Sequence, residues 1–395
     1  MAEHHAGEER AAAPALEEEP RVDISVVIPC LNEEENIEAC VEQAWAGIKA
    51  SGLTGEVVVA DNASEDDSAR LAAKAGARVI TEPRRGYGSA YLAGFAAARG
   101  DVIVMGDADL TYDFMEIPRF VEMIREGGAD MVIGDRMDNI KPGAMPWMHR
   151  YIGNPLLSGI LNLFYHTGVR DAHCGMRAFR RDRLQDMDLR TTGMEFASEM
   201  VIRAAKEHLD IRQVPIEYHP RGGTSKLSTF RDGWRHLRFL LVHSPMHLFI
   251  IPGLIMAAIG AIIMIVAFSG VNIFGREWQV HTLIGGALLL MCGTQAVGFG
   301  VGARTYAFYY MNDRSPRIER WRARFRLEHG LLLGVAVTLV GLGLLVWLFV
   351  QWAGSDFGSL AEQKVAVLGA TLVVVGLQIV FASFLVSILG IRRPR

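Results

Sequence analysis

Residues 102–109 read VIVMGDAD, an apolar run that ends in two aspartates one residue apart. The run Val102–Met105 has the length and apolar composition of a buried strand, so Asp107 and Asp109 follow directly on the expected end of that strand. About one Asp-x-Asp triplet is expected by chance in a chain of this length. The second triplet here, Asp186–Asp188, follows a basic stretch and is interpreted as surface. The preceding strand therefore distinguishes the first pair.

Strands and helices alternate around this stretch. Strands are predicted at Ile24–Ile28, Glu56–Ala60, Arg78–Thr81, Val102–Met105 and Met131–Ile133, and helices at Glu34–Lys49, Asp66–Ala75, Gly88–Ala98 and Met115–Glu126. The alternation predicts an α/β fold with a mostly parallel, doubly wound sheet. In such a sheet ligands bind beyond the carboxyl ends of the strands.

Polar segments follow four of these strands. They are PCLNE (29–33), DNASED (61–66), GDAD (106–109) and GDR (134–136). Two carboxylates at such a strand end can share a hard divalent cation that also binds diphosphate oxygens. A cation in that position neutralises the charge that builds up on a leaving nucleotide diphosphate.

The second half of the chain is strongly apolar. Half of the 395 residues are hydrophobic and the mean hydropathy is +0.20. Crossing a bilayer takes about 20 apolar residues. Four segments reach that length: Leu248–Phe268, Val280–Ala303, Gly330–Trp352 and Val365–Ile391. We therefore predict four transmembrane helices over residues 248–391, in preference to buried helices of a soluble domain.

Loop charges predict the orientation of these helices. The loop of residues 304–329 carries seven arginines and residues 391–395 carry three, whereas the loops of residues 269–279 and 353–363 carry one between them. Arginine-rich loops stay inside, so both termini and the first domain are expected on the cytoplasmic side of the inner membrane. Residues 1–22 lack the apolar segment of a signal peptide and are predicted to form a disordered acidic tail.

Residues 229–247 connect the two halves. Their FRDGWRHLRFLL core mixes basic and aromatic side chains, which suits an amphipathic helix at an anionic membrane surface. A plain linker helix is the alternative. The net charge of −4 gives no basic signature of nucleic-acid binding. Membrane lipid is an expected partner, and nucleic acid is not.

Seven segments, in this order, resemble family 2 glycosyltransferases of the GT-A fold, specifically the polyprenyl-phosphate branch that includes dolichyl-phosphate mannose and glucose synthases. They are VVIPCLNEEENI (26–37), DNASEDDS (61–68), EPRRGYGSA (82–90), GDADLTYD (106–113), GDR (134–136), DAHCGMRAF (171–179) and RGGTSKL (221–227). The resemblance implies a GT-A catalytic domain over residues 23–228, a nucleotide-sugar donor and a polyprenyl phosphate acceptor.

The resemblance also implies residue roles. Metal binding to Mg²⁺ or Mn²⁺ falls to Asp107 and Asp109, and the acceptor phosphate to Arg136, Arg150 and Asn154. Donor binding falls to Pro29, Leu31, Glu33, Asp61, Asn62, Ser64, Gly86, Gly88, Ala108, Arg221, Ser225 and Lys226. Many family members have Asp where this chain has Asn62, which leaves the base open. Gly86 and Gly88 could equally be turn residues, and Arg150 a surface residue.

Glu195 and Glu199 lie one helical turn apart. One of them could be catalytic, or both could orient arginines such as Arg177 and Arg203. We keep Glu199 among the candidate catalytic residues, with Asp107, Asp109, Arg136 and Arg150, and expect Glu195 to be an orienting group.

A lipid phosphate acceptor needs no general base. Its second pKa is near 6, so the nucleophile is largely dianionic at neutral pH. We therefore expect a one-step displacement that inverts the anomeric carbon, with UDP-glucose favoured as donor and GDP-mannose close behind.

Two other functions stay open. A processive polysaccharide synthase would carry Gln-x-x-Arg-Trp, but the comparable segment here, residues 317–321, reads RIERW without the Gln. The membrane half could instead act as a lipid-sugar flippase or a scaffold, although it lacks the interior acid or base that marks a transport path. Its many glycines suit tight helix packing and could also form an interface between copies of the chain.

Overall fold

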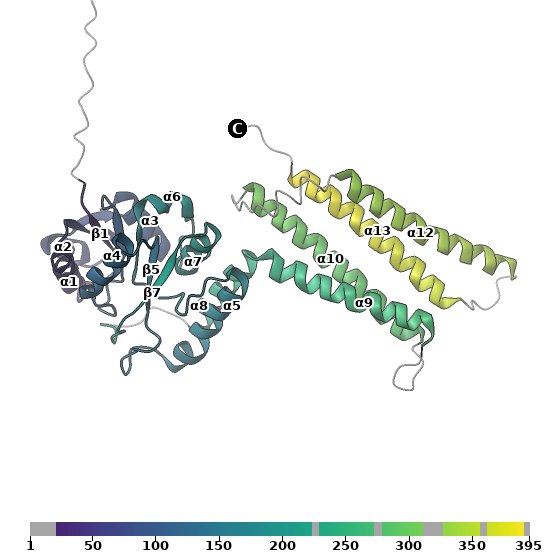
Figure 1. Cartoon of the computed structure of the whole chain (residues 1–395), viewed down its shortest axis with the longest axis horizontal. Helices are drawn as coiled ribbons and strands as arrows, with labels where there is room; N and C mark the ends of the chain where they lie inside the picture. The colour runs from purple at the N-terminus through teal and green to yellow at the C-terminus, as the bar shows by residue number, and fades with distance from the viewer. Residues whose placement is uncertain (1–20, 223–228, 272–278, 311–326, 356–361, 391–395) are drawn as a thin grey trace, which may run out of the picture. The chain divides into compact units, whose positions relative to one another are not determined.

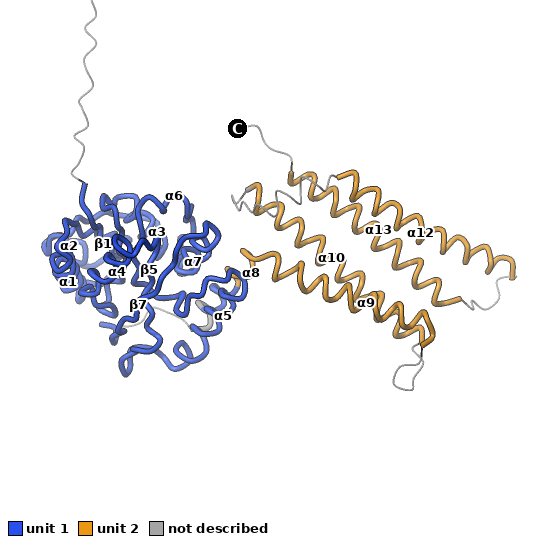
Figure 2. Tube along the Cα trace, in the orientation of Figure 1, with its two compact units in different colours: residues 1–237 blue, residues 238–395 orange. Residues whose placement is uncertain are grey.

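The computed structural model describes residues 21–222, 229–271, 279–310, 327–355 and 362–390 (Figure 1). The chain divides into two compact units, Met1–Leu237 and Arg238–Arg395, here called unit 1 and unit 2 (Figure 2). The predicted acidic tail, the donor residues Ser225 and Lys226, and most of the arginine-rich loop lie outside the described residues.

Unit 1 contains a seven-stranded sheet in the order β3-β2-β1-β4-β6-β5-β7. The strands are β1 (Ile24–Cys30), β2 (Gly55–Asp61), β3 (Arg78–Thr81), β4 (Val102–Met105), β5 (Met131–Asp135), β6 (Arg177–Arg180) and β7 (Ile211–Pro215). Neighbouring strands run parallel, except that β6 is antiparallel to both β4 and β5. The predicted mostly parallel α/β sheet is confirmed. Strands β6 and β7 were not predicted.

Helices cover this sheet. They are α1 (Ile37–Ala50), α2 (Ser68–Lys74), α3 (Tyr87–Ala97), α4 (Ile117–Arg125), α5 (Asn154–Tyr165), α6 (Leu184–Met187) and α7 (Phe196–Lys206), followed by α8 (Thr229–Val242). The helix predicted at Met115–Glu126 begins as a 3-10 turn, Phe114–Glu116, and becomes α-helical from Ile117, with Pro118 in its first turn, where a missing N–H costs nothing.

The centre of the sheet is dry, because helices shield both of its faces. Every residue of β4 is buried, as are nearly all of β1. This is why these strands read as continuous apolar runs in the sequence. The register pairs Cys30 with Asp61 and Val27 with Met105. The carboxyl ends of β1, β2 and β4 therefore meet at one edge, and the polar segments after them share it.

Unit 2 consists of long apolar helices: α9 (Ile251–Ser269), α10 (Val280–Tyr310), α12 (Leu327–Gly354) and α13 (Gln363–Leu389). With the π-helical turn Met246–Ile250 that precedes α9, they give four candidate membrane spans among the described residues. The predicted membrane domain is thus confirmed as four helices. The second one was predicted to end at Ala303, but α10 continues to Tyr310.

The helices of unit 2 pack as two antiparallel hairpins, α9 with α10 and α12 with α13, and α10 also lies against α13 (Figure 1). Each helix carries two glycines seven residues apart, which is two helical turns and therefore one face. The pairs are Gly253 and Gly260, Gly286 and Gly293, Gly334 and Gly341, and Gly369 and Gly376.

These paired glycines bring the backbones of the two helices together. A Cβ on Gly260 would lie 2.4 Å from the backbone nitrogen of Leu290, and one on Gly341 would lie 2.7 Å from the carbonyl oxygen of Gly369. Such contact between small residues is the usual basis of helix association in membranes.

Candidate active site

Asp107 and Asp109 lie at the carboxyl end of β4. Oδ1 of Asp107 accepts hydrogen bonds from the hydroxyl groups of Tyr87 (3.0 Å) and Tyr91 (3.2 Å). Oδ1 of Asp109 accepts hydrogen bonds from the amide (3.1 Å) and the hydroxyl (2.5 Å) of Thr111. Burial, followed by the charge of Asp109, raises the pKa of Asp107 to about 6. Two carboxylates that disfavour each other's charge in this way are stabilised by a cation.

The residues at this edge fit a divalent cation such as Mg²⁺. Such an ion is held by one or two carboxylates and takes its other ligands from phosphates and water. Asp107 and Asp109 supply two carboxylates. Among the described residues, no group of three or more His, Cys, Asp and Glu side chains could hold a metal ion without substrate. A metal site here would therefore be completed by the donor diphosphate.

Arg221 lies beside the carboxylates. Its Nε is 3.5 Å from Oδ2 of Asp109, and its Nη2 donates to Oε1 of Glu33 at 2.8 Å. The following residue is fastened as well, because Nδ2 of Asn36 donates to the carbonyl of Gly222 at 3.1 Å. The start of the RGGTSKL segment thus reaches both Asp109 and the segment after β1.

Gly175 closes the other side of Asp107. A Cβ on Gly175 would lie 2.6 Å from Oδ2 of Asp107, so only glycine fits this approach. The amide of Gly175 donates to the hydroxyl of Tyr112 at 2.7 Å, and Nη1 of Arg136 donates to the same hydroxyl at 3.1 Å. Tyr112 therefore links the DAHCGMRAF segment to the GDR segment.

Arg136 and Asp171 form a buried, two-pronged ion pair. Nε of Arg136 donates to Oδ2 of Asp171 at 2.6 Å, and Nη2 donates to Oδ1 at 2.8 Å. Burial alone would raise the pKa of Asp171, but the charge and hydrogen bonds of Arg136 hold that pKa below its usual value. The guanidinium also stacks 4.8 Å from the ring centre of Tyr218. Arg136 was predicted to clamp the acceptor phosphate, yet here its donors serve Asp171 and Tyr112.

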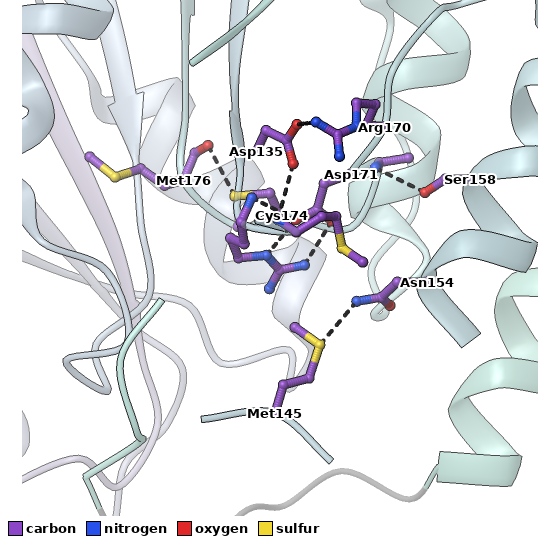
Figure 3. A network of polar contacts seen from close by, with 12 residues as sticks. Asp135, Met145, Asn154, Ser158, Arg170, Asp171, Cys174 and Met176 are labelled. Atoms are coloured by element: carbon purple, nitrogen blue, oxygen red, sulfur yellow. Dashed lines mark hydrogen bonds and ion pairs between the residues drawn. The ribbon is translucent and has the colours of Figure 1, made fainter. Parts of the chain in front are cut away.

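The other predicted acceptor residues lie on a separate segment. Arg150 belongs to the π-helical turn His149–Gly153 and rests 5.3 Å from the ring centre of Tyr151. Asn154, the first residue of α5, donates from Nδ2 to the sulfur of Met145 at 3.5 Å (Figure 3). Both side chains are partly exposed, so they remain open to a ligand.

Figure 3 also shows an arginine that the sequence analysis did not select. Nη1 of Arg170 forms ion pairs with Asp135 at 3.1 Å and Asp138 at 2.9 Å. The backbone of the neighbouring Ala172 is held by the hydroxyl of Ser158 in α5 at 3.2 Å. The bond to Ser158 ties the DAHCGMRAF segment to α5, the helix that follows Arg150, whereas the ion pairs of Arg170 tie the residue before the segment to the end of β5.

The predicted donor residues after β2 have different tasks. Asn62 donates from Nδ2 to the carbonyls of Glu82 (3.0 Å) and Arg84 (2.8 Å), and its Oδ1 accepts from the amide of Gly86 at 2.6 Å. Asn62 therefore fastens the loop before α3. Asp61 is buried, and its Oδ1 has no hydrogen-bond partner among the described residues. An unsatisfied buried carboxylate oxygen is costly, so it fits a ligand that donates hydrogen bonds.

The remaining predicted donor residues lie along the same edge. Ser64 accepts at Oγ a hydrogen bond of 3.0 Å from the amide of Asn32. Pro29 and Leu31 are partly buried at the end of β1, and Ala108 is buried between the two aspartates.

Gly86 and Gly88 are sites of close backbone approach. A Cβ on Gly86 would lie 2.2 Å from the carbonyl oxygen of Thr192, and one on Gly88 would lie 2.2 Å from that of Thr191. These contacts pack the first turn of α3 against residues 190–192. The turn itself, and with it Tyr87, can be placed only because both neighbours lack side chains.

Glu199 holds residues 190–192 in place. Its carboxylate accepts from the amides of Arg190 (3.1 Å) and Thr191 (2.9 Å) and from the Thr191 hydroxyl (2.7 Å), and Nε of Arg203 lies 4.0 Å away. Glu199 is a candidate catalytic residue for which an orienting role was left open. Its oxygens accept hydrogen bonds from this loop, which is the geometry of an orienting group.

The hydrogen-bond partners of Arg177 differ from those expected. Its guanidinium is fully buried and donates to the carbonyls of Ala172 (2.9 Å), Cys174 (2.9 Å) and Ala197 (2.8 Å). The prediction that Glu195 or Glu199 orients Arg177 is therefore wrong. Burial lowers the pKa of Arg177 from its ordinary value.

The sequence analysis missed Tyr87, Tyr91, Tyr112 and Gly175. One signal was available: Tyr87 and Tyr91 are four residues apart directly after Gly86, which places them on one face of the predicted helix. Nothing comparable marked Tyr112 or Gly175, whose contacts depend on how segments far apart in the sequence meet.

Known proteins resemble the chain in both halves. Residues 25–187 match Glycosyl transferase family 2, and residues 301–390 match the Glycosyltransferase family 2 C-terminal transmembrane region. A solved structure, glucosyl-3-phosphoglycerate synthase from Mycobacterium tuberculosis in complex with phosphoglyceric acid, is 23% identical with a TM-score of 0.47, covering 56% of this chain and 80% of its own.

Two relatives come from Haloferax volcanii. The low-salt glycan biosynthesis hexosyltransferase Agl6 is 44% identical over 388 residues, which is 98% of this chain and 93% of Agl6. A dolichyl-phosphate hexose transferase is 36% identical over 213 residues, 53% of this chain and 89% of that protein. With nearly the whole chain matched at this identity, the protein belongs to glycosyltransferase family 2 and carries that family's C-terminal transmembrane region.

Proposed function

We propose that this enzyme transfers a hexose from a nucleotide-sugar to polyprenyl phosphate at the inner leaflet of the membrane. The observation that carries the proposal is the pair Asp107 and Asp109 at the end of β4, beside a donor segment in which Oδ1 of Asp61 is buried without a partner. The names of the two Haloferax relatives support a hexose and a lipid phosphate.

The donor side is built for a nucleoside diphosphate. Asp107 and Asp109 would hold Mg²⁺ or Mn²⁺, which when bound stabilises the diphosphate as it leaves. Arg221 lies against Asp109 and carries a second positive charge to the same place. Asp61 would accept a hydrogen bond from the base or ribose. UDP-glucose is the favoured donor and GDP-mannose the second choice.

The acceptor side carries an apolar surface. Six large apolar side chains around Arg150 are between 40% and 65% exposed: Trp147, Met148, Tyr151, Ile152, Leu156 and Leu163. The opposite face of α5 packs inward through Leu157 and Leu161. Aromatic and aliphatic side chains beside an arginine suit the boundary between headgroups and acyl chains. That boundary is where a polyprenyl phosphate presents its phosphate, within reach of Arg150 and Asn154.

The chemistry requires no protein base. Glu199, the glutamate kept among the candidate catalytic residues, accepts hydrogen bonds from the backbone of residues 190–191. A dianionic lipid phosphate is itself a nucleophile near neutral pH. One of its oxygens bonds to the anomeric carbon while the bond from that carbon to the diphosphate oxygen breaks, and the nucleoside diphosphate leaves with the electron pair. The configuration of the sugar inverts, and no proton has to move.

The proposed orientation follows from the loop charges. The catalytic unit and both termini lie on the cytoplasmic side, where nucleotide-sugars are made, and four spans anchor the enzyme. To test this orientation, the four native cysteines are replaced. A single cysteine is then placed either in the loop of residues 311–326 or in the loop of residues 356–361. A membrane-impermeant thiol reagent applied to sealed cells should label the second loop only.

The function is tested with the full chain in lipid vesicles. Radiolabelled nucleotide-sugars are supplied one at a time with polyprenyl phosphate, and the lipid phase is extracted. We expect one donor to label the lipid, with a single sugar per lipid, and no label when polyprenol without phosphate replaces the acceptor. Asp107→Ala and Asp109→Ala should abolish transfer while thermal unfolding stays cooperative, and chelation of divalent metal should stop the wild-type reaction.

Other outcomes would identify the alternatives. A product with many sugars per lipid would indicate a processive synthase. Movement of a lipid-linked sugar across the vesicle membrane without any donor would indicate a flippase. Full activity in the presence of a chelator would remove the metal from the mechanism.

A further inference from the structure

Two tyrosines support one oxygen of Asp107. The hydroxyl groups of Tyr87 and Tyr91 both donate to Oδ1, at 3.0 and 3.2 Å. The two residues are one turn apart on α3, so their side chains leave the same face of the helix. Their rings meet edge to face with centres 4.9 Å apart. A carboxylate oxygen that accepts two hydroxyl groups from one rigid helix has little freedom to rotate.

The position of Tyr91 is itself fixed by packing. Its side chain is fully buried, and its ring lies parallel to that of Phe196 in α7, with centres 5.8 Å apart. Phe95, one turn further along α3, lies 5.5 Å from the ring of Tyr91. These contacts hold the ring whether or not the hydroxyl is present. A Tyr91→Phe substitution would therefore remove the hydrogen bond and leave the packing intact.

Tyr87 connects this support to the donor segment. It stands between Gly86 and Gly88, whose backbones lie against the carbonyls of Thr192 and Thr191. The amide of Gly86 is held by Asn62, the residue after β2. The first turn of α3, which belongs to the EPRRGYGSA segment, therefore also supplies a hydrogen bond to Asp107.

The second oxygen of Asp107 is restricted from the opposite direction. Oδ2 faces Gly175 so closely that a Cβ there would lie 2.6 Å away. Gly175 in turn is held by the hydroxyl of Tyr112. The carboxylate therefore lies between two tyrosine hydroxyl groups on one side and a glycine backbone on the other.

We propose that Tyr87 and Tyr91 are positioning residues for the cation ligand Asp107, and that they tie cation affinity to the placement of the first turn of α3. This inference rests on the metal of the proposed function. Groups that hydrogen-bond to a metal ligand fix its orientation, and their loss commonly weakens metal affinity by about 10- to 100-fold. Neither tyrosine needs to touch substrate, because both act through Asp107.

The test measures metal binding without turnover. Mn²⁺ binding to the detergent-solubilised full chain is followed by electron paramagnetic resonance, alone and with UDP, for wild type, Tyr87→Phe, Tyr91→Phe and the double variant. We expect each single variant to weaken Mn²⁺ binding about tenfold and the double variant more, up to about 100-fold. UDP binding without metal should stay as in wild type, whereas the gain in UDP affinity that Mn²⁺ gives wild type should shrink.

Tyr165→Phe is the matched control. Its ring lies under the ammonium group of Lys206 and its hydroxyl does not donate to Asp107, so the same loss of one hydroxyl should leave Mn²⁺ binding unchanged. Unchanged Mn²⁺ affinity in the Tyr87→Phe, Tyr91→Phe double variant would overturn the inference, provided that Asp107→Asn abolishes binding. If wild type itself takes up no Mn²⁺ with or without UDP, the metal of the proposed function fails instead.

Discussion

A methyl group on Gly175 would lie 2.6 Å from the carboxylate of Asp107, and one on Gly293 would lie 2.4 Å from the backbone nitrogen of Ala257. The first contact belongs to unit 1 and the second to unit 2. At Gly175 the neighbour is a carboxylate of the candidate metal site, so the glycine determines where that carboxylate can lie. At Gly293 the neighbour is the backbone of another helix, so the glycine determines how closely α9 and α10 pack.

Both glycines leave no room for a side chain, but substituting them should affect different properties of the protein. In unit 1 Gly86 and Gly88 together position the first turn of α3 against residues 190–192, and Gly175 lies against Asp107. In unit 2 the glycines repeat along the helices, and each contributes one part of a long contact. Substitutions in unit 1 should therefore affect activity before stability, and substitutions in unit 2 should do the reverse.

Among the glycine substitutions, the largest effect on activity is expected from Gly175→Ala. The added Cβ displaces Asp107 or the backbone beside it, and a misplacement of about 1 Å costs about 100-fold in rate. Transfer of labelled sugar to the lipid phase measures the loss, and a thermal unfolding curve shows whether the fold survives. Gly159→Ala in α5 is the control, because nothing lies within 4 Å of its Cβ position. Wild-type activity in Gly175→Ala would show that this glycine does not determine where Asp107 lies.

A smaller effect is expected from Gly88→Ala. The Cβ would meet the carbonyl oxygen of Thr191 at 2.2 Å and push the first turn of α3 away from residues 190–192. Overpacking of this kind costs about 1–3 kcal/mol, and about 1.4 kcal/mol is tenfold in affinity. We expect the KM for the donor to rise about tenfold. A fall in kcat with an unchanged KM would instead place this turn at the reacting carbon.

Glu199→Gln affects the same contact between residues 190–192 and the first turn of α3. The amide keeps one acceptor oxygen for the backbone of residues 190–191 but loses the negative charge that strengthens those hydrogen bonds. The KM for the donor should rise about threefold, as expected for the loss of one such hydrogen bond, and kcat should stay near the wild-type value. Initial rates at varied donor concentration separate the two. Removal of a general base would instead lower kcat by about 100-fold or more.

The smallest effect on activity is expected from Gly293→Ala in unit 2. The Cβ forces α9 and α10 apart, which should lower the free energy of unfolding by about 1–3 kcal/mol. Transfer per folded molecule should match wild type. Gly285→Ala on the same helix is the control, because its Cβ would meet nothing within 4 Å. Equal thermal stability of the two variants would show that the glycines of this hairpin do not set its packing.

The strands that could be predicted are those whose burial is visible in the sequence. Strands β1, β2, β4 and β5 read as apolar, partly β-branched runs because most of their residues are buried. The short strand β3, although predicted as well, is only partly buried. Strand β6 reads RAFR, and its Arg177 is buried only because three carbonyls from other segments accept its hydrogen bonds. No local pattern reveals such a partnership. Strand β7, partly exposed at the sheet edge, gave an equally weak signal.

The candidate site divides along a similar line. Asp107 and Asp109 could be selected because a strand end is a local feature and strand ends collect at one edge. The spacing of Tyr87 and Tyr91 shows only that they share a helix face. That this face meets Asp107, and that Gly175 lies against the same carboxylate, depends on the sheet order, which places β1 and β6 beside β4. The sequence left the role of Glu199 open for a related reason: it shows a carboxylate one turn from Glu195, but not the loop whose amides donate to it.

Asn62 has a consequence for how enzymes of this family could diverge. Its amide nitrogen gives two hydrogen bonds to the carbonyls of Glu82 and Arg84, and its oxygen receives one from Gly86. An aspartate at this position would keep the bond from Gly86 but would set a negative charge against two carbonyl oxygens. The loop before α3 would then have to follow another path. Exchange of a single NH₂ group for an oxygen would thus be enough to change the path of residues 82–86, which begin beside Asp61.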